Sequence, residues 1–156
     1  MKDFLQNTDY LDMAYLYATK TSGCCKVAVG CVIEKQGHMI SFGSNKAILS
    51  NCKSLGCYRA RKYGNDSKIH RNPDDCSSIH SEVDALSNLR ESAVDAIAYV
   101  TRYPCEGCAK ALISAGISMV VYGGTTEISD LTRRMFDNYN IRVLWIPDWK
   151  EDNSDR

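Results

Sequence analysis

The chain has 156 residues, of which 44% are hydrophobic, and its formal net charge at pH 7 is zero. This length suits one domain with a substantial core, and the balance of charge argues against a nucleic-acid polymer as the partner. Acidic side chains interrupt residues 1–20, and no apolar run has the length of a signal peptide or a membrane span. We therefore expect a single cytoplasmic domain over residues 1–156, with a polar tail at 149–156.

Eight residues are cysteines, which is a large number for a cytoplasmic chain of this size. In a reducing compartment, cysteines rarely form a disulfide framework, so metal ligation or catalysis is the better interpretation. A single free cysteine is more often a small buried hydrophobic residue. The informative cysteines are therefore those that occur in clusters with metal-ligand spacing.

The first part of the chain predicts a helix followed by a β-hairpin. Hydrophobic residues first recur at helical spacing, and then two apolar segments flank a short turn. The expected elements are a helix over residues 8–20 capped by Thr8, a strand over 27–34, a turn at Gln36 and Gly37, and a strand over 38–44.

The second half alternates helices and strands. This alternation is typical of parallel strands joined by right-handed crossovers, here attached to the initial hairpin, and it predicts an α/β fold. The expected elements are a helix over 80–91 with Val83, Leu86 and Leu89 on one face, strands over 96–101, 117–122 and 141–146, and helices over 105–115 and 128–139.

Two short motifs carry residues that suit a metal site. His80 and Glu82 form a His-x-Glu motif at the start of one predicted helix, and a Pro-Cys-x-x-Cys motif places Cys105 and Cys108 at the start of the next. One imidazole and two thiolates leave a tetrahedral zinc with an open position, as a catalytic site requires, and helix N-termini favour thiolate charge. The two motifs together are the signature of zinc-dependent nucleobase deaminases, in which the glutamate moves protons. We therefore expect His80, Cys105 and Cys108 to bind zinc and Glu82 to be catalytic.

The cysteine pair alone has other interpretations. It could be a thiol–disulfide redox site or one half of a structural zinc site. A redox pair typically follows the first strand of a thioredoxin-type unit, whereas Cys105 follows the third predicted strand. Chance explains many single His-x-Glu motifs, but both motifs in this order, each at a helix start, favour the catalytic zinc site.

The stretch from about residue 15 to residue 146 resembles the cytidine and deoxycytidylate deaminase superfamily, and specifically deoxycytidylate (dCMP) deaminases, phage enzymes included. The matching segments are residues 24–45, IHSEVDAL, and YVTRYPCEGCAKALISAGISMVVYGG. The resemblance implies a three-layer α/β/α fold around a five-stranded mixed sheet and a zinc cofactor. It also implies hydrolysis of dCMP to ammonia and dUMP, the precursor for thymidylate synthesis, by a homo-oligomer that is usually a hexamer.

The same resemblance implies substrate contacts. Asn45 matches the asparagine that contacts the nucleotide in such enzymes, and Asp84 stands where many relatives have asparagine. Tyr103 could pack against the base or sugar, or simply close its loop. Asn45 is followed by Lys-Ala-Ile, where regulated dCMP deaminases usually carry Gly-x-Pro, and this departure argues against control by dCTP and dTTP. His-Ser-Glu in place of the common His-Ala-Glu exchanges one small residue for another.

Residues 45–78 carry no regular pattern, and a loop of this length in a compact domain needs something to organise it. Three thiolates and one imidazole make a closed structural zinc site, and some dCMP deaminases, to which the chain is similar, hold a second zinc from the same regions. Otherwise these cysteines are reduced and partly buried. The expected ligands are Cys24, Cys57, His70 and Cys76, with Cys25 and Cys52 as possible substitutes.

The same insertion has an excess of positive charge, which could receive the 5′-phosphate of a nucleotide. A solvated basic loop is the more frequent meaning of such a pattern. The residues are Lys53, Arg59, Arg61, Lys62, Lys68 and Arg71, against Asp66.

Two other functions are compatible with parts of this pattern. A deaminase acting on tRNA adenosine or single-stranded cytosine uses the same motifs, but it needs a positive groove to hold the polymer. The zero net charge counts against it, although the basic insertion favours it. A catalytically inactive zinc-binding module would have no use for Glu82.

Overall fold

The centre of the molecule is a five-stranded mixed β-sheet. The computed structural model describes residues 6–48, 52–64, 76–124 and 128–149. β1 runs antiparallel to both of its neighbours, whereas the last three strands are parallel to one another. In spatial order the strands are β2 (His38–Ser44), β1 (Gly30–Lys35), β5 (Ile97–Val100), β6 (Met119–Gly123) and β7 (Arg142–Ile146).

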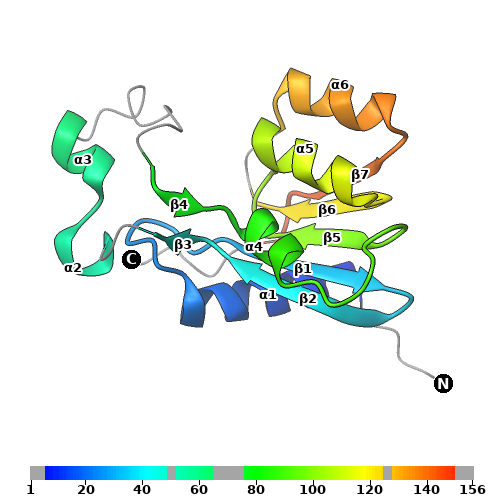
Figure 1. The fold of residues 1–156 in the computed structure, drawn as a ribbon, viewed down its shortest axis with the longest axis horizontal. Helices are drawn as coiled ribbons and strands as arrows, with labels where there is room; N and C mark the ends of the chain where they lie inside the picture. Colours follow the sequence, from blue (N-terminus) through cyan, green and yellow to red (C-terminus); the bar gives the residue numbers. More distant parts are fainter. Residues whose placement is uncertain (1–5, 49–51, 65–75, 125–127, 150–156) are drawn as a thin grey trace.

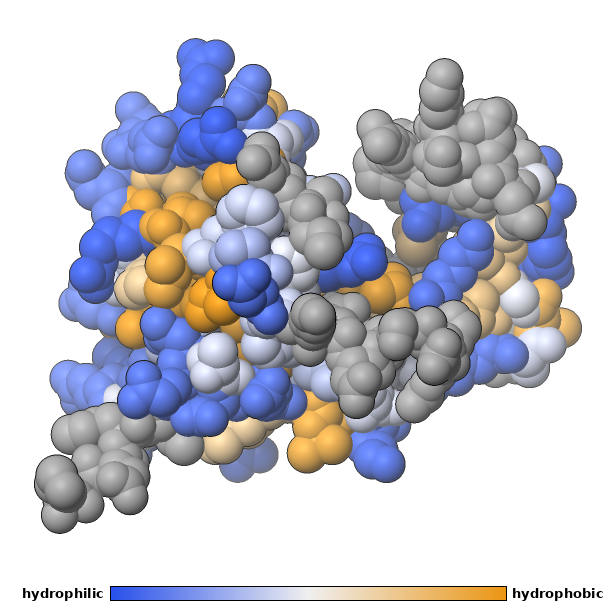
Figure 2. All heavy atoms as spheres, turned by 180° about the vertical axis from the view of Figure 1, so that it is seen from behind, coloured by the Kyte–Doolittle hydropathy of each residue, from blue (hydrophilic) through white to orange (hydrophobic). Residues whose placement is uncertain are grey.

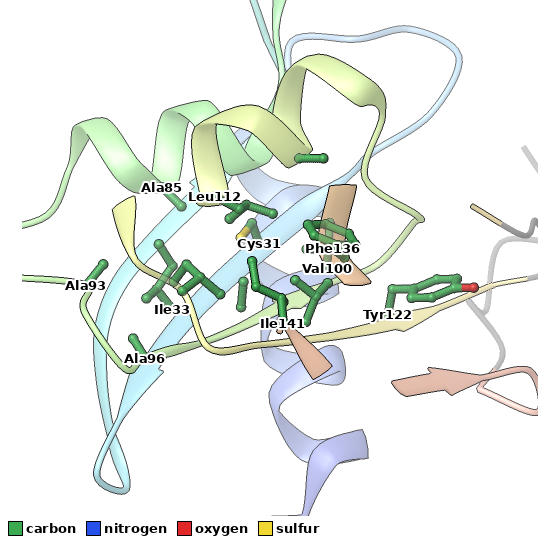
Figure 3. Close-up of a cluster of buried hydrophobic side chains, with 14 of the residues drawn as sticks. Cys31, Ile33, Ala85, Ala93, Ala96, Val100, Leu112, Tyr122, Phe136 and Ile141 are labelled. Carbon is green, nitrogen blue, oxygen red and sulfur yellow. The ribbon is translucent and has the colours of Figure 1, made fainter. Parts of the chain in front are cut away.

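Helices cover both faces of this sheet, which confirms the predicted three-layer α/β/α fold (Figure 1). α1 (Asn7–Thr21) packs on one face, and α4 (Ser81–Ser87), α5 (Glu106–Ala115) and α6 (Asp130–Asn138) lie on the other. None of the described helices has the length and apolar character to span a membrane. Because side chains alternate along a strand, the core has two parts: Val32, Tyr99 and Val121 pack with α1, and Cys31, Ile33, Val100, Leu112 and Phe136 pack on the opposite face (Figure 3).

Two glycines allow helices to approach the hairpin closely. A Cβ atom at Gly30 would lie 1.9 Å from the carbonyl oxygen of Ala14 in α1. On the other face, a Cβ atom at Gly43 would lie 2.1 Å from the carbonyl oxygen of Ser81 in α4. The hairpin therefore carries a helix in direct backbone contact on each face, and the helix that follows His80 is fixed against β2.

Two predicted element starts were wrong. α1 begins with a capping box in which Gln6 and Asp9 each bond the backbone of the other, so Thr8 is not the cap. β1 begins at Gly30 instead of residue 27. The Asn45 side chain occupies backbone groups of the residues just before this strand, and those groups are lost to the sheet.

The predicted buried face of α4 was also wrong. The helix ends at Ser87 instead of residue 91, and Val83 is 38% exposed. Leu86 and Leu89 are only partly buried against the core. The helix turns mainly polar side chains inward, because that face forms part of the candidate site. Its buried residues are Ser81, Glu82, Asp84 and Ala85.

Short elements organise part of the predicted irregular segment. β3 (Lys46–Ala47) pairs antiparallel with β4 (Ser78–Ile79), and α2 (Cys52–Leu55) and α3 (Tyr58–Tyr63) lie between them in the chain. Figure 1 shows α2 and α3 at one end of the molecule, beyond the sheet. Both hydrophilic and hydrophobic side chains appear at that end in Figure 2.

We predict that Gly43→Ala lowers the free energy of unfolding by about 2–3 kcal/mol, because the added methyl group must displace the backbone of α4. Urea denaturation measures this change. The matched control is Gly107→Ala in α5, where the nearest atom to a new Cβ is the Cys105 sulfur at 3.9 Å. Alanine in a helix interior is neutral or stabilising by up to about 1 kcal/mol. Equal stability of the two variants would contradict the close contact at Gly43.

Candidate active site

The residues of the two predicted motifs meet at one edge of the sheet. β2 and β5 run in the same direction, so their carboxyl ends lie at this edge beside the start of β1. His80 immediately precedes α4, and Cys105 immediately precedes α5, each with extended backbone. Ligands of α/β sheets bind outside the carboxyl ends of the strands. The predicted metal ligands occupy such a position.

The three predicted zinc ligands are spaced as a tetrahedral zinc requires. His80 Nδ1 lies 3.4 Å from Cys105 Sγ and 3.3 Å from Cys108 Sγ, and all three atoms lie within 4.8 Å of one another. With Zn–N of about 2.0–2.1 Å and Zn–S of about 2.3 Å, the N···S edge of a regular tetrahedron is about 3.5 Å. The donor set therefore fits zinc and leaves the fourth position open. No other group of three or more such side chains converges in this way among the described residues.

Hydrogen bonds shift the pKa values of the two thiols in opposite directions. The bond from Cys108, followed by the bond to His80, lowers the pKa of Cys105 to about 3. The same bond to Cys105, together with burial, raises the pKa of Cys108. The bond to Cys105 also raises the pKa of His80 above its ordinary 6.5. Cys105 is thus available as a thiolate, and Cys108 releases its proton when a metal binds.

Glu82 lies beside the ligands in a buried position. It is 4% exposed, and burial is the main cause that raises the pKa of its carboxyl group. The positive charge of His80 and a hydrogen bond with Cys108 act in the opposite direction. The hydroxyl group of Ser81 donates to Oε2 of Glu82 over 3.1 Å. This carboxyl group is held next to the three ligands, where it can accept and return a proton.

Asn45 joins the end of β2 to the segment before β1. Its Oδ1 accepts hydrogen bonds from the N–H of Val29 and the hydroxyl of Ser22, and its Nδ2 donates to the carbonyl of Val27. The residue is 7% exposed. Asn45 therefore holds the end of β2 to the segment before β1, whereas its contact with a nucleotide stays a prediction.

Asp84 fixes the residues on both sides of Asn45. Its carboxylate accepts a hydrogen bond of 3.0 Å from the N–H of Ser44 and forms a 2.8 Å ion pair with Nζ of Lys46. Asp84 is buried, so this pairing compensates the charge that folding removes from water. The described contacts of Asp84 lie within the protein, and its predicted contact with a substrate stays a prediction.

The other predicted site residues are only partly placed. Tyr103 is half-buried and packs against the core. Cys52 lies near four other cysteines predicted as ligands or substitute ligands of the second zinc. Burial is the largest cause that raises the pKa of Cys52, followed by Cys25, Cys24, Cys57 and Cys76. His70 lies outside the described residues. Cys24 and Cys25 thus lie near the described cysteines of the insertion, but these cysteines do not converge as closely as the group around His80.

Sequence reasoning missed the roles of Ser81 and Lys46. Ser81 replaces one small residue by another in the motif, but its buried hydroxyl donates a hydrogen bond to Glu82. Lys46 directly follows Asn45 and pairs across the ladder with Ile79, which precedes His80. The sequence did offer one signal for Lys46: a charged residue directly follows Asn45, which is a predicted substrate contact.

The geometry can support hydrolysis by a zinc-activated water. A site with three protein ligands and an open position is typical of catalytic zinc, and the adjacent carboxyl group provides general acid–base chemistry. Together with the three-layer fold, these features define the class of zinc-dependent nucleobase deaminases.

The chain belongs to the family of the cytidine and deoxycytidylate deaminase zinc-binding region, whose model matches residues 5–124. It is 32% identical over 138 residues to a deoxycytidylate deaminase of Saccharomyces cerevisiae, covering 86% of this chain and 42% of that protein. It is also 30% identical to the deoxycytidylate deaminase of Enterobacteria phage T2, covering 75% of this chain and 79% of that protein. The chain thus spans less than half of the yeast relative and most of the phage relative.

Solved structures share the fold. A dCMP deaminase of the cyanophage S-TIM5 in apo form matches with a TM-score of 0.66 at 22% identity, covering 90% of this chain and 96% of that chain. The same cyanophage protein in complex with dCMP and dUMP matches with a TM-score of 0.65 at 23% identity, covering 88% and 93%.

The buried carboxyl group leads to a prediction for the zinc-free protein. Folding raises the pKa of Glu82, so the folded state holds its proton more tightly than the unfolded state. This contribution to stability is complete below pH 4.5, the ordinary value, and is lost as the pH rises through the raised pKa. Glu82→Gln cannot ionise, so zinc-free protein with this substitution should unfold at a higher Tm than the parent at pH 8.

Thermal unfolding at pH 4 and pH 8, in the presence of a chelator, tests this expectation. The gain from Glu82→Gln should be absent at pH 4. Glu91→Gln, which replaces an exposed carboxylate, is the control and should give no gain at either pH. A gain that does not depend on pH would show that burial of the Glu82 charge is not its cause.

Proposed function

We propose that this chain catalyses the hydrolysis of dCMP to dUMP and ammonia. The observation that carries the proposal is the buried carboxyl group of Glu82 beside three convergent zinc ligands. Family membership supports it, as do relatives named deoxycytidylate deaminase and a similar cyanophage structure that holds dCMP and dUMP.

The roles of the residues follow from their positions. Zinc, when bound by His80, Cys105 and Cys108, increases the acidity of water at its open position. In the net reaction, a bond forms between the water oxygen and C4 of the cytosine, and the bond from C4 to the amino nitrogen breaks. Glu82 accepts the two protons of the water one after the other and delivers one to the ring nitrogen and one to the departing amino group. Ser81 holds the carboxyl group in place for these transfers.

Ammonia release from dCMP by the zinc-loaded chain tests this proposal directly. We expect turnover of dCMP to exceed that of CMP and cytidine, and a tRNA-like hairpin to release no ammonia. Glu82→Gln should lower kcat by at least about 10²-fold, the lower range for general acid–base catalysis. Its zinc content should equal that of the parent.

Other outcomes of the same assay would point elsewhere. Turnover of the hairpin in preference to dCMP would support a nucleic-acid base deaminase. Bound zinc without turnover of any substrate would support an inactive zinc-binding module. Full activity in Glu82→Gln would exclude the proton-transfer role of this residue.

We further propose that a second, structural zinc organises the insertion. The support is the gathering of Cys24, Cys52, Cys57 and Cys76 in one region. Burial raises the pKa of Cys57, but the backbone N–H groups of Ala60 and Arg59 and nearby positive charge outweigh it, so the net shift favours a thiolate. The proposed ligands are Cys24, Cys57, His70 and Cys76, with Cys25 and Cys52 as alternatives.

Metal analysis tests the second site. We expect two zinc ions per chain in the parent and one in Cys57→Ser. The matched control is Cys31→Ala, which removes a buried thiol that is not a proposed ligand of either zinc and should retain two. One zinc per chain in the parent would contradict the proposal.

Quaternary structure and location complete the proposal. We infer a homo-oligomer, with a hexamer favoured, in the cytoplasm, or in the host cytoplasm for a phage protein. Large exposed hydrophobic side chains on and near the insertion support self-association: Ile48 is 65% exposed, Leu55 60% and Tyr58 53%. Lys46, Ala47 and Ile48 stand where regulated relatives carry Gly-x-Pro, and Lys46 is paired with Asp84, so dCTP and dTTP are not expected to act as effectors.

A further inference from the structure

Lys46 joins the two segments that enter and leave the insertion at the candidate active site. It directly follows Asn45, and in the β3–β4 ladder it pairs with Ile79, the residue before His80. β4 leads through His80 into α4 (Figure 1). The backbone of Lys46 therefore connects a predicted substrate contact with a predicted zinc ligand.

The side chain of Lys46 reaches the third part of the site, the first turn of α4. Its Nζ lies 2.8 Å from Oδ1 of Asp84, which stands two residues after Glu82. Oδ2 of the same carboxylate accepts the N–H of Ser44 over 3.0 Å, and the backbone N–H of Asp84 donates to the carbonyl of His80 over 2.9 Å. Asp84 thus ties the end of β2, the cation and the start of α4 together.

The two members of this ion pair differ in exposure. The side chain of Asp84 is 8% exposed, whereas that of Lys46 is 42% exposed. A buried carboxylate that loses its cation retains its desolvation cost without compensation. An exposed lysine that loses its carboxylate is solvated by water. Lys46 is therefore the group that makes a charged residue tolerable at position 84, beside the residues that carry the chemistry.

Asn45 is held on one side only by its own side chain. Its Oδ1 and one N–H of Nδ2 are bonded to residues between 22 and 29, in the segment before β1. An amide nitrogen carries two N–H groups, and the part of the chain that the structure describes offers the second one no acceptor. This second N–H is available to a ligand. The tie from Asn45 to α4 runs through its two chain neighbours, both of which bond Asp84.

We propose that Lys46 is a positioning residue that, through Asp84, holds Asn45 at a fixed separation from the start of α4. This inference rests on the proposed function. The start of α4 carries His80 and Glu82, so a nucleotide oriented by Asn45 presents C4 of its base to the proton-transfer group in one geometry. Misplacement of reacting groups by about 1 Å can lower a rate by about 10²-fold.

Steady-state kinetics of the zinc-loaded chain with dCMP tests Lys46→Met, which keeps a long side chain and removes its charge. We expect kcat to fall by about ten- to a hundredfold and KM to change by less than about threefold, because Asn45 keeps its own hydrogen bonds and its contact with the nucleotide. Zinc content should equal that of the parent. Lys46→Arg retains the ion pair and should keep kcat within about threefold of the parent.

The partner residue provides a second variant. Asp84→Asn retains an acceptor for the N–H of Ser44 but cannot form an ion pair with Lys46. It should reproduce the fall in kcat, and the addition of Lys46→Met should cause no further fall, because the two side chains act as one pair. Losses that multiply in the double variant would overturn the proposal, since that is the behaviour of independent side chains.

The matched control is Arg133→Met, which breaks the exposed ion pair with Asp130 in α6. Exposed ion pairs contribute little, so this variant should keep kcat within about twofold of the parent. A raised KM at unchanged kcat in Lys46→Met would overturn the proposal, because the side chain would then contribute binding instead of alignment. Unchanged values of both constants would overturn it as well.

Amide hydrogen exchange of the zinc-loaded protein without nucleotide separates failure of this inference from failure of the proposed function. In Lys46→Met, the amides of Ser44 and Asn45 should exchange faster by at least about tenfold, because the tie to α4 no longer opposes local opening. Amides in β6 should exchange as in the parent. Equal exchange in the two proteins, or faster exchange throughout the sheet, would contradict a local role of Lys46. If the parent does not deaminate dCMP, the proposed function fails, and the exchange rates still decide whether Lys46 holds Asn45.

Discussion

The candidate site depends on the contact between the first turns of α4 and α5, because no single segment contains all of its ligands. His80 comes from the start of one helix, and both cysteines come from the first turn of the other. Two sets of contacts hold these starts in register with the sheet. Gly43 permits backbone contact between β2 and α4, and Asp84 bonds the end of β2 from within the same helix. Thr101 and Gly30 exchange hydrogen bonds at the carboxyl end of β5, just before the loop that leads to α5.

This arrangement places polar groups where hydrophobic side chains would stabilise the fold more. The inner face of α4 buries a glutamate, an aspartate and a serine, and each is held by a specific partner. Asp84 is compensated by Lys46, whereas Glu82 has a raised pKa because burial is opposed only in part by His80. A carboxyl group that binds its proton more tightly than usual is suited to exchange protons with a substrate near neutral pH. The same burial that reduces stability therefore prepares the group for catalysis.

Much of the fold and of the metal centre was predictable from the sequence, because these features depend on local patterns. Alternating hydrophobic segments identified the strands, and Gly116 marked the end of α5 in the left-handed conformation. His80, Glu82, Cys105 and Cys108 were identified from two motifs whose spacing reflects helix geometry. The inner face of α4 was not predictable from hydrophobic periodicity, since Val83 faces outward while charged residues face inward. The start of β1 was missed because a distant side chain, Asn45, takes its backbone hydrogen bonds.

The central claim is that His80, Cys105 and Cys108 hold a zinc ion with Glu82 beside it but not bound to it. Anomalous diffraction at the zinc absorption edge from crystals of the zinc-loaded protein tests this claim most directly. The account predicts an anomalous peak about 2.0–2.1 Å from Nδ1 of His80 and about 2.3 Å from the two sulfur atoms. The peak should have no bond to the carboxylate of Glu82. A peak bonded to Glu82, or no peak between the three ligands, would contradict the account.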